Sequence, residues 1–279
     1  MENISFQQER FLPFIDDWIT IQIYSGSTYL DKLLSQLRNP ILELIEEGIV
    51  ISFFFIRYRD PDPHLRLRFK IKNSLNIKTV FDSLYNVFRE PIKLKVIWKI
   101  KFDGYDRELF RYSYVAISLV EEIFHHCSVF ILSKLHIYEN RLILALSIFD
   151  LLISLLGYDL YEKYAFCKDA KTRFMYEFDF TKNTRNVLAL KFKAYEELIA
   201  NSFKYIYNPD FEELKVSLSP LCEELKKLEE FGVSHRKFTI VSSLLHMNFN
   251  RIFVSDGRIK EAIIYYLLDK YYAKLVCQR

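Results

Sequence analysis

The hydrophobic pattern of this chain changes its period near residue 105. Before that point, short apolar runs rich in β-branched and aromatic residues predict strands at 18–24, 50–59, 64–71 and 91–102. A helical period between them predicts helices at 29–47, with Pro40 expected to kink or restart it, and at 77–89. Beyond residue 105, the 3.6-residue period predicts helices at 112–136, 139–156, 160–176, 184–206, 211–230, 235–250 and 258–276.

This order of elements predicts an α+β fold, in which an N-terminal, mainly antiparallel sheet layer packs with a predominantly helical C-terminal half. The strands at 50–59 and 64–71 flank a Pro-Asp-Pro turn, so we expect them to pair as a hairpin. No internal repeat, low-complexity segment or clear linker interrupts the chain. We therefore expect a single domain over residues 1–279 rather than two independent domains.

Composition and charge exclude several classes of protein. The chain has only 6 glycines and neither of the glycine-rich phosphate-binding motifs. Its net charge of +3 is too small to indicate direct nucleic-acid binding. The first residues lack the pattern of a secretory signal, and the longest apolar run, 142–156, is too short to span a bilayer comfortably. A cytoplasmic protein is the resulting expectation.

Cysteine and histidine spacing argues against a metal site. The 4 cysteines are widely separated, which is typical of reduced thiols rather than of a disulfide framework or a zinc site. Glu121 with His125, or Glu122 with His126, could supply two ligands from one helix, but no third ligand follows at a recognisable spacing. We expect neither a metal nor another cofactor.

The most informative stretch is FFFIRYRDPDPHLRLRFK at 53–70. Side chains alternate along a strand, so Arg66 and Arg68 project to one face and Leu65 and Leu67 to the other. Two guanidinium groups on one face suit a ligand with one or more carboxylates. From this stretch alone, a solvated sheet face is the competing interpretation.

Two further clusters carry charged or titratable side chains. Glu108 and Arg111 stand three residues apart at a strand-to-helix junction, where a surface ion pair is the simplest reading. His246 and Asn250 stand four apart on one side of a predicted helix. Histidine titrates in the range of a general acid or base, although a histidine on an apolar helix is more often part of the core.

Five segments carry a family resemblance, and they occur in the family's order. They are WITIQIY at 18–24, FFFIRYRDPDPHLRLRF at 53–69, YDRELFRY at 105–112, EEIFHHCS at 121–128 and HMNFNR at 246–251. Together they resemble the C-terminal elimination domain of class I lanthipeptide dehydratases and the related stand-alone thiopeptide biosynthesis proteins. The chain departs from that pattern at Ser113 and Tyr114, where the family commonly has two glycines, and at Cys127, where it has an acidic residue.

The resemblance implies a lyase of peptide natural-product biosynthesis. Its substrate would be a ribosomal precursor peptide whose Ser or Thr has been glutamylated by a separate, tRNA-dependent protein. Elimination of glutamate would leave dehydroalanine or dehydrobutyrine. Because the chain carries no glutamylation domain, we expect it to act in trans, as part of a split dehydratase. A cyclase or transporter complex and a second copy of the chain are the other partners considered.

By the same resemblance, His246 is the acid or base, Arg66 and Arg68 anchor the glutamyl adduct or stabilise negative charge, and Glu108 with Arg111 orients the site. The resemblance does not decide which residue removes the α-proton. These five residues are expected to lie in one cleft. The expected substrate-binding residues are Arg57, His64, Tyr112, Asn250 and Arg251.

Two other functions compete with elimination. A pyridine synthase of the same family would join two dehydroalanines in a formal cycloaddition and expel the leader peptide. A non-catalytic scaffold would bind the peptide as an added strand at the sheet edge. The five candidate catalytic residues fit the elimination pattern, so we favour elimination.

Overall fold

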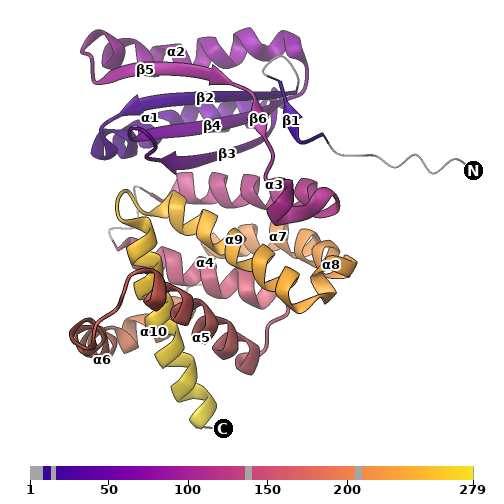
Figure 1. Cartoon of the computed structure of the whole chain (residues 1–279). Helices are drawn as coiled ribbons and strands as arrows, with labels where there is room; N and C mark the ends of the chain where they lie inside the picture. The colour runs from indigo at the N-terminus through magenta and orange to yellow at the C-terminus, as the bar shows by residue number, and fades with distance from the viewer. Residues whose placement is uncertain (1–8, 14–16, 136–139, 205–208, 279) are drawn as a thin grey trace, which may run out of the picture. The chain divides into compact units, whose positions relative to one another are not determined.

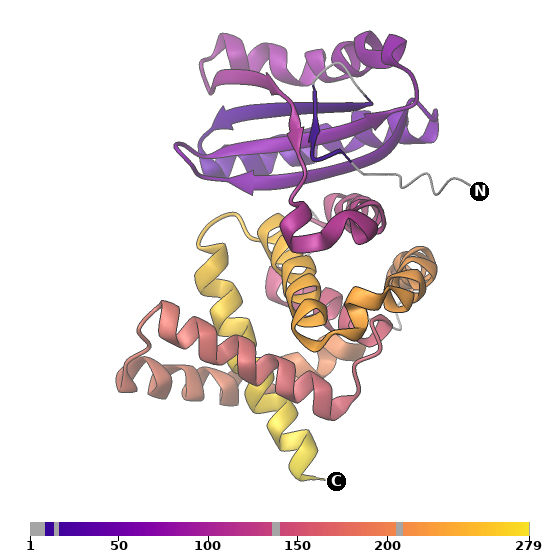
Figure 2. The same ribbon diagram turned by 45° about the vertical axis from the view of Figure 1, so that its right-hand side comes forward.

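The computed structural model describes residues 9–13, 17–135, 140–204 and 209–278 (Figures 1 and 2). The chain folds as two units, Met1–His136 and Ile137–Arg279, and each is described here by itself. The first contains the sheet and the second is built from helices. The predicted α+β class is confirmed. The expectation of a single domain over the whole chain stays a prediction.

A four-stranded antiparallel sheet forms the centre of the first unit (Figure 1). Its strands, in the spatial order β3-β4-β2-β5, are β3 (Val50–Tyr58), β4 (His64–Ile71), β2 (Trp18–Ser25) and β5 (Ile97–Asp103). The predicted hairpin is confirmed, because β3 and β4 pair with Phe54 opposite Arg68 and Ile56 opposite Arg66. The predicted strand at 91–102 begins only at Ile97, since the preceding helix continues to Lys93.

Two helices pack on the sheet and on each other, which gives a β-α-β-β-α-β order of the ferredoxin-like type. Helix α1 (Ser27–Glu46) runs through Pro40 without ending there. Gly48 follows its end, and the positive φ of this glycine allows the amides of residues 48 and 49 to donate to carbonyls of the last turn. The 3₁₀ turn η1 (Ser74–Asn76) leads into α2 (Ile77–Lys93), which carries Pro91 inside it.

The rest of the first unit connects the sheet to a long helix. The short strands β1 (Phe11–Leu12) and β6 (Tyr105–Asp106) form a second, two-stranded sheet that the sequence pattern did not predict. Helix α3 (Leu109–Lys134) follows and packs against β3. It is kinked at Ser113, with φ 65° and ψ 166°. Among the described helices, only α3 is long and apolar enough to cross a membrane. However, 61% of its most apolar 18-residue stretch is buried inside the protein.

In the described residues of the second unit, all regular elements are helices. They are α4 (Arg141–Leu155), α5 (Leu160–Glu177), α6 (Lys182–Lys204), α7 (Pro209–Lys227), α8 (Glu229–Gly232), α9 (Ser234–Ile252) and α10 (Gly257–Cys277). The helical period therefore predicted these elements correctly, apart from the short α8; residues 139, 205 and 206 of the predicted ranges lie outside the described residues. Helix α4, the longest apolar run, is buried, as predicted.

Helix α10 packs against α5, α6 and α9, and most of its Tyr-rich segment is buried. It therefore covers the core of its own unit. The 4 cysteines are free thiols, and only Cys277 is exposed.

Candidate functional site

Arg66 and Arg68 lie on one face of the sheet, as the alternation predicted. In β4 they stand opposite Gln22 and Thr20 of β2, whereas Leu67, which lies between them, stands opposite Ile21. Directly opposed residues of an antiparallel pair share a face, so Arg66 and Arg68 share theirs with the polar side of β2. We call this side of the sheet the arginine face.

Arg68 is a buried cation, with only 9% of its surface exposed. Its guanidinium carbon lies 4.3 Å from the ring centroid of Tyr105 and 5.4 Å from that of Phe54. No hydrogen bond or ion pair joins Arg68 to another described residue, and its Nε is completely buried. Burial lowers the pKa of Arg68, but a guanidinium remains protonated in proteins. The result is a fixed positive charge that is held by aromatic rings rather than by a carboxylate.

Arg66 is oriented by its neighbours on the same face. Its Nε–H donates to Nε2 of His64 at 3.0 Å, and His64 in turn donates Nδ1–H to the carbonyl of Asp62 at 2.8 Å. The guanidinium also lies 3.9 Å from the centroid of the Tyr58 ring. Burial lowers the pKa of His64, which favours the neutral ring that accepts from Arg66. His64 therefore acts here as a support for Arg66.

A buried ion pair next to Arg68 was missed from the sequence. Arg107 donates from Nε and Nη2 to the two carboxylate oxygens of Glu121, each at 2.8 Å, and the Tyr105 hydroxyl donates to the same carboxylate. These contacts hold the Tyr105 ring beside Arg68. The sequence had suggested Glu121 as a weak metal-ligand candidate, but in the structure its oxygens bind Arg107. Within the described residues, no group of three His, Cys, Asp or Glu side chains could hold a metal ion.

Glu108 and Arg111 form an ion pair of 3.0 Å at the start of α3, and both are substantially exposed. The negative charge of Glu108 opposes the lowering of the Arg68 pKa, so Glu108 acts electrostatically on the arginine face. Tyr112, in the same turn, is buried and meets the Phe124 ring edge-on, with centroids 5.7 Å apart. The start of α3 therefore carries an exposed ion pair, Glu108–Arg111, next to the buried side chain of Tyr112.

Arg57 lies on the opposite side of the sheet from Arg66 and Arg68. It stands opposite Leu65 in the β3-β4 pair, which assigns it to the other face, and it forms an ion pair of 2.6 Å with Asp31 of α1. The structure therefore does not bring Arg57 together with the other arginines of the sheet.

His246 of α9 contacts a buried carboxylate of α10. Its Nδ1 lies 2.7 Å from Oε2 of Glu261, whose side chain is only 3% exposed, whereas that of His246 is 28% exposed. The second ring nitrogen, Nε2, forms no hydrogen bond with any residue that the structure describes. Asn250, one turn later, is also partly exposed, while Arg251 is fully buried. His246 and Asn250 thus lie on the same, partly exposed side of α9, as predicted.

The candidate residues fall into two sets. Arg66, Arg68, Glu108 and Arg111 belong to the first unit, and His246 belongs to the second. The meeting of the two sets in one cleft therefore stays a prediction.

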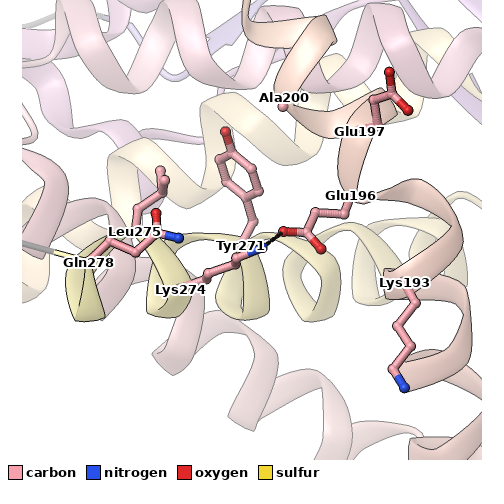
Figure 3. Close-up of a pocket in the computed structure, with 8 residues that line it drawn as sticks. All are labelled: Lys193, Glu196, Glu197, Ala200, Tyr271, Lys274, Leu275 and Gln278. Carbon is pink, nitrogen blue, oxygen red and sulfur yellow. Dashed lines mark hydrogen bonds and ion pairs between the residues drawn. The ribbon is translucent and has the colours of Figure 1, made fainter.

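The second unit also has an open pocket of about 460 Å³ between α6 and α10 (Figure 3). An ion pair between Lys274 and Glu196 crosses it, and Tyr271 projects toward α6 (Figure 3). None of the candidate residues lines this pocket. We therefore give this pocket no catalytic role.

Comparison with known proteins agrees with the motifs. The sequence model of the lantibiotic biosynthesis dehydratase C-terminal family matches residues 18–272, which includes most of both units. The chain belongs to this family. The resemblance drawn from the five segments is thereby confirmed, and it places the chain among proteins of lantibiotic biosynthesis.

Among curated proteins, the dehydratase-family chain is similar to the nisin biosynthesis protein NisB of Lactococcus lactis subsp. lactis, with 27% identity over 275 residues. The match covers 96% of this chain but only 26% of NisB. The chain thus spans about a quarter of the length of that relative.

Two solved structures share the fold of this family member. The tRNA-dependent lantibiotic dehydratase MibB from Microbispora sp. 107891 aligns with a TM-score of 0.73 at 19% identity, over 95% of this chain and 29% of MibB. The pyridine synthase TbtD from thiomuracin biosynthesis aligns with a TM-score of 0.69 at 11% identity, over 95% of this chain and 100% of TbtD. At these identities the likeness shows the fold alone.

Proposed function

We propose that this chain is a lyase that eliminates glutamate from glutamylated Ser or Thr of a ribosomal precursor peptide. The observation that carries the proposal is Arg68. A buried guanidinium with no carboxylate partner among the described residues is suited to an anionic ligand, and glutamate esterified through one carboxyl group keeps a second, free carboxylate. Membership in the dehydratase family supports the same reaction class.

The chemistry assigns each part a task. A base removes the α-proton of the modified Ser or Thr, its electrons form the Cα=Cβ double bond, and the Cβ–O bond breaks as glutamate leaves. His246 is the proposed acid or base, because Nε2 has no bond to a described residue and Nδ1 is already held. Arg66 and Arg68 would bind the free carboxylate and stabilise negative charge during elimination.

The other residues have supporting tasks in this proposal. Glu108 with Arg111 would orient the site, and His64 would hold Arg66 in place. The remaining substrate-binding candidates are Tyr112, Asn250 and Arg251. Arg57 is not kept as a candidate at this site, because it lies on the other face of the sheet and pairs with Asp31.

We propose that the reaction takes place in the cytoplasm and in trans. A separate, tRNA-dependent protein would supply the glutamylated peptide. The description of MibB as a tRNA-dependent lantibiotic dehydratase supports such a coupling. A cyclase or transporter complex would receive the dehydrated product. The chain itself can be tested for assembly into a homodimer.

The test is incubation of the protein with a glutamylated precursor peptide, followed by mass spectrometry and measurement of free glutamate. We expect loss of the glutamyl adduct with formation of the dehydro residue. Arg68→Gln should slow release about 10²- to 10³-fold, as removal of a preorganised charge-stabilising donor does. Arg89→Gln, at an exposed arginine of α2, is the matched control and should keep the wild-type rate.

Two outcomes would contradict the proposal. Conversion only of a peptide that already carries dehydroalanines, with release of the leader peptide, would indicate cycloaddition. Binding of the peptide without any change of mass would indicate a scaffold. A His246→Ala variant that keeps the full rate of glutamate release would remove His246 from the mechanism.

A further inference from the structure

We propose that Glu261 is a positioning residue for His246, which it holds in the orientation and tautomer that proton transfer requires. The inference rests on the proposed function and adds a residue that lies outside every motif of the sequence. It starts from one contact. Nδ1 of His246 lies 2.7 Å from Oε2 of Glu261, a distance typical of a charge-assisted hydrogen bond.

This contact fixes which ring nitrogen is free. A carboxylate can only accept a hydrogen bond, so the proton of a neutral His246 ring must be on Nδ1. The lone pair is then on Nε2, the nitrogen without a bond to a described residue. A histidine held in this way by a carboxylate can take a proton at Nε2, and the resulting imidazolium is stabilised by the same carboxylate.

The carboxylate itself is firmly held. Arg258, one turn earlier on α10, donates to Oε2 of Glu261 at 3.4 Å and forms an ion pair of 2.6 Å with Glu177 at the end of α5. The Arg258 guanidinium also lies 4.4 Å from the centroid of the Phe174 ring. Three helices thus fix the position of Glu261. Because Arg258 supplies a permanent positive charge, the carboxylate does not depend on a protonated His246 for a partner.

A purely structural ion pair is the alternative, and kinetics separate the two. Glu261→Gln keeps the shape of the side chain, but its amide can either accept from Nδ1–H or donate to Nδ1, so it no longer fixes the tautomer. We expect kcat for glutamate release to fall at least tenfold, as when an outer-shell partner of a functional histidine is lost. The KM for the peptide should change little, because Glu261 touches His246 and not the substrate. Glu261→Asp should restore part of kcat.

The matched control is Asp269→Asn, on the same helix. Asp269 is likewise buried and forms an ion pair of 2.6 Å with Lys171. This variant loses a comparable buried carboxylate away from His246, so it should lower the unfolding free energy while keeping kcat. If Asp269→Asn and Glu261→Gln lower kcat equally, the effect of Glu261 is structural and the inference is wrong.

A second measurement does not need the reaction. In ¹⁵N spectra of histidine-labelled protein, the His246 signals are identified by their absence from a His246→Gln variant. We expect Nδ1 to carry the proton of the neutral ring in wild type and the population to shift toward protonated Nε2 in Glu261→Gln. A wild-type ring protonated at Nε2 would overturn the inference. If wild type releases no glutamate, the proposed function fails, and this spectrum alone decides whether Glu261 sets the tautomer.

Discussion

Replacement of His125 by asparagine should remove part of the acid sensitivity of the first unit. His125 lies on α3, and its Nδ1 accepts the amide hydrogen of Phe53 in β3 at 3.0 Å. Burial, with a smaller contribution from the neighbouring His126, lowers the pKa of His125 to about 4. In the unfolded chain the same side chain titrates near its ordinary pKa of 6.5. Between these two values, the unfolded chain binds a proton that the folded chain does not bind.

The sign and size of the effect follow from this difference. The histidine pKa is lower in the folded state, so stability falls as the pH drops from about 6.5 toward about 4. Each pKa unit corresponds to about 1.4 kcal/mol, and the loss between pH 7 and pH 4.5 is about 2 kcal/mol. Asparagine places its amide oxygen near the position of Nδ1, so the Phe53 amide keeps an acceptor while the titrating group is gone.

The measurement is urea unfolding of wild type and His125→Asn at pH 7 and at pH 4.5. The unfolding free energy of the variant relative to wild type should rise by about 2 kcal/mol at the lower pH. His235→Asn, at an exposed histidine at the start of α9, controls for a general effect of losing an imidazole. A difference between wild type and His125→Asn that is constant to within about 0.5 kcal/mol would refute the argument.

Two other perturbations test the packing around the arginine face. Glu121→Leu or Arg107→Met alone should cost about 3–5 kcal/mol of unfolding free energy, because each leaves a buried charged partner uncompensated, whereas the two substitutions together should cost much less. Additive losses in a double-mutant cycle would contradict this. Ser113→Gly should be more stable than Ser113→Ala by about 1 kcal/mol or more, because the backbone at φ 65° and ψ 166° favours glycine. Equal urea midpoints for these two variants would exclude strain at Ser113.

The sequence predicted features that depend on local periodicity. Arg66 and Arg68 were assigned to one face because side chains alternate along any strand, whatever the neighbouring strands are. The start of β5 was placed too early because the alternation in KLKVIWKIKF begins at Lys93, although Lys93 still belongs to α2 and the strand begins at Ile97. The β1-β6 pair is two residues long, which is too short for a detectable period.

Contacts between elements were not predictable from spacing. Arg107 precedes α3, so no helical period relates it to Glu121, fourteen residues later. Glu261 lies one helix beyond His246, and nothing in HMNFNR indicates which residue of α10 will face the imidazole. To predict this contact, one would have to know that Glu261 is buried and faces His246, and a single sequence does not show this.

Arg68 has no carboxylate partner among the described residues because the neighbouring acidic side chains pair with other arginines. Glu121, whose charge acts on Arg68, is bound at both oxygens by Arg107, and Glu108 is paired with Arg111. Each of these carboxylates thus has a nearer cation, while Arg68 is held by the rings of Tyr105 and Phe54. Aromatic contact stabilises a guanidinium without neutralising its charge. The fold therefore keeps Arg68 both immobile and electrostatically available, and a carboxylate of the substrate would complete the pairing that the protein leaves open.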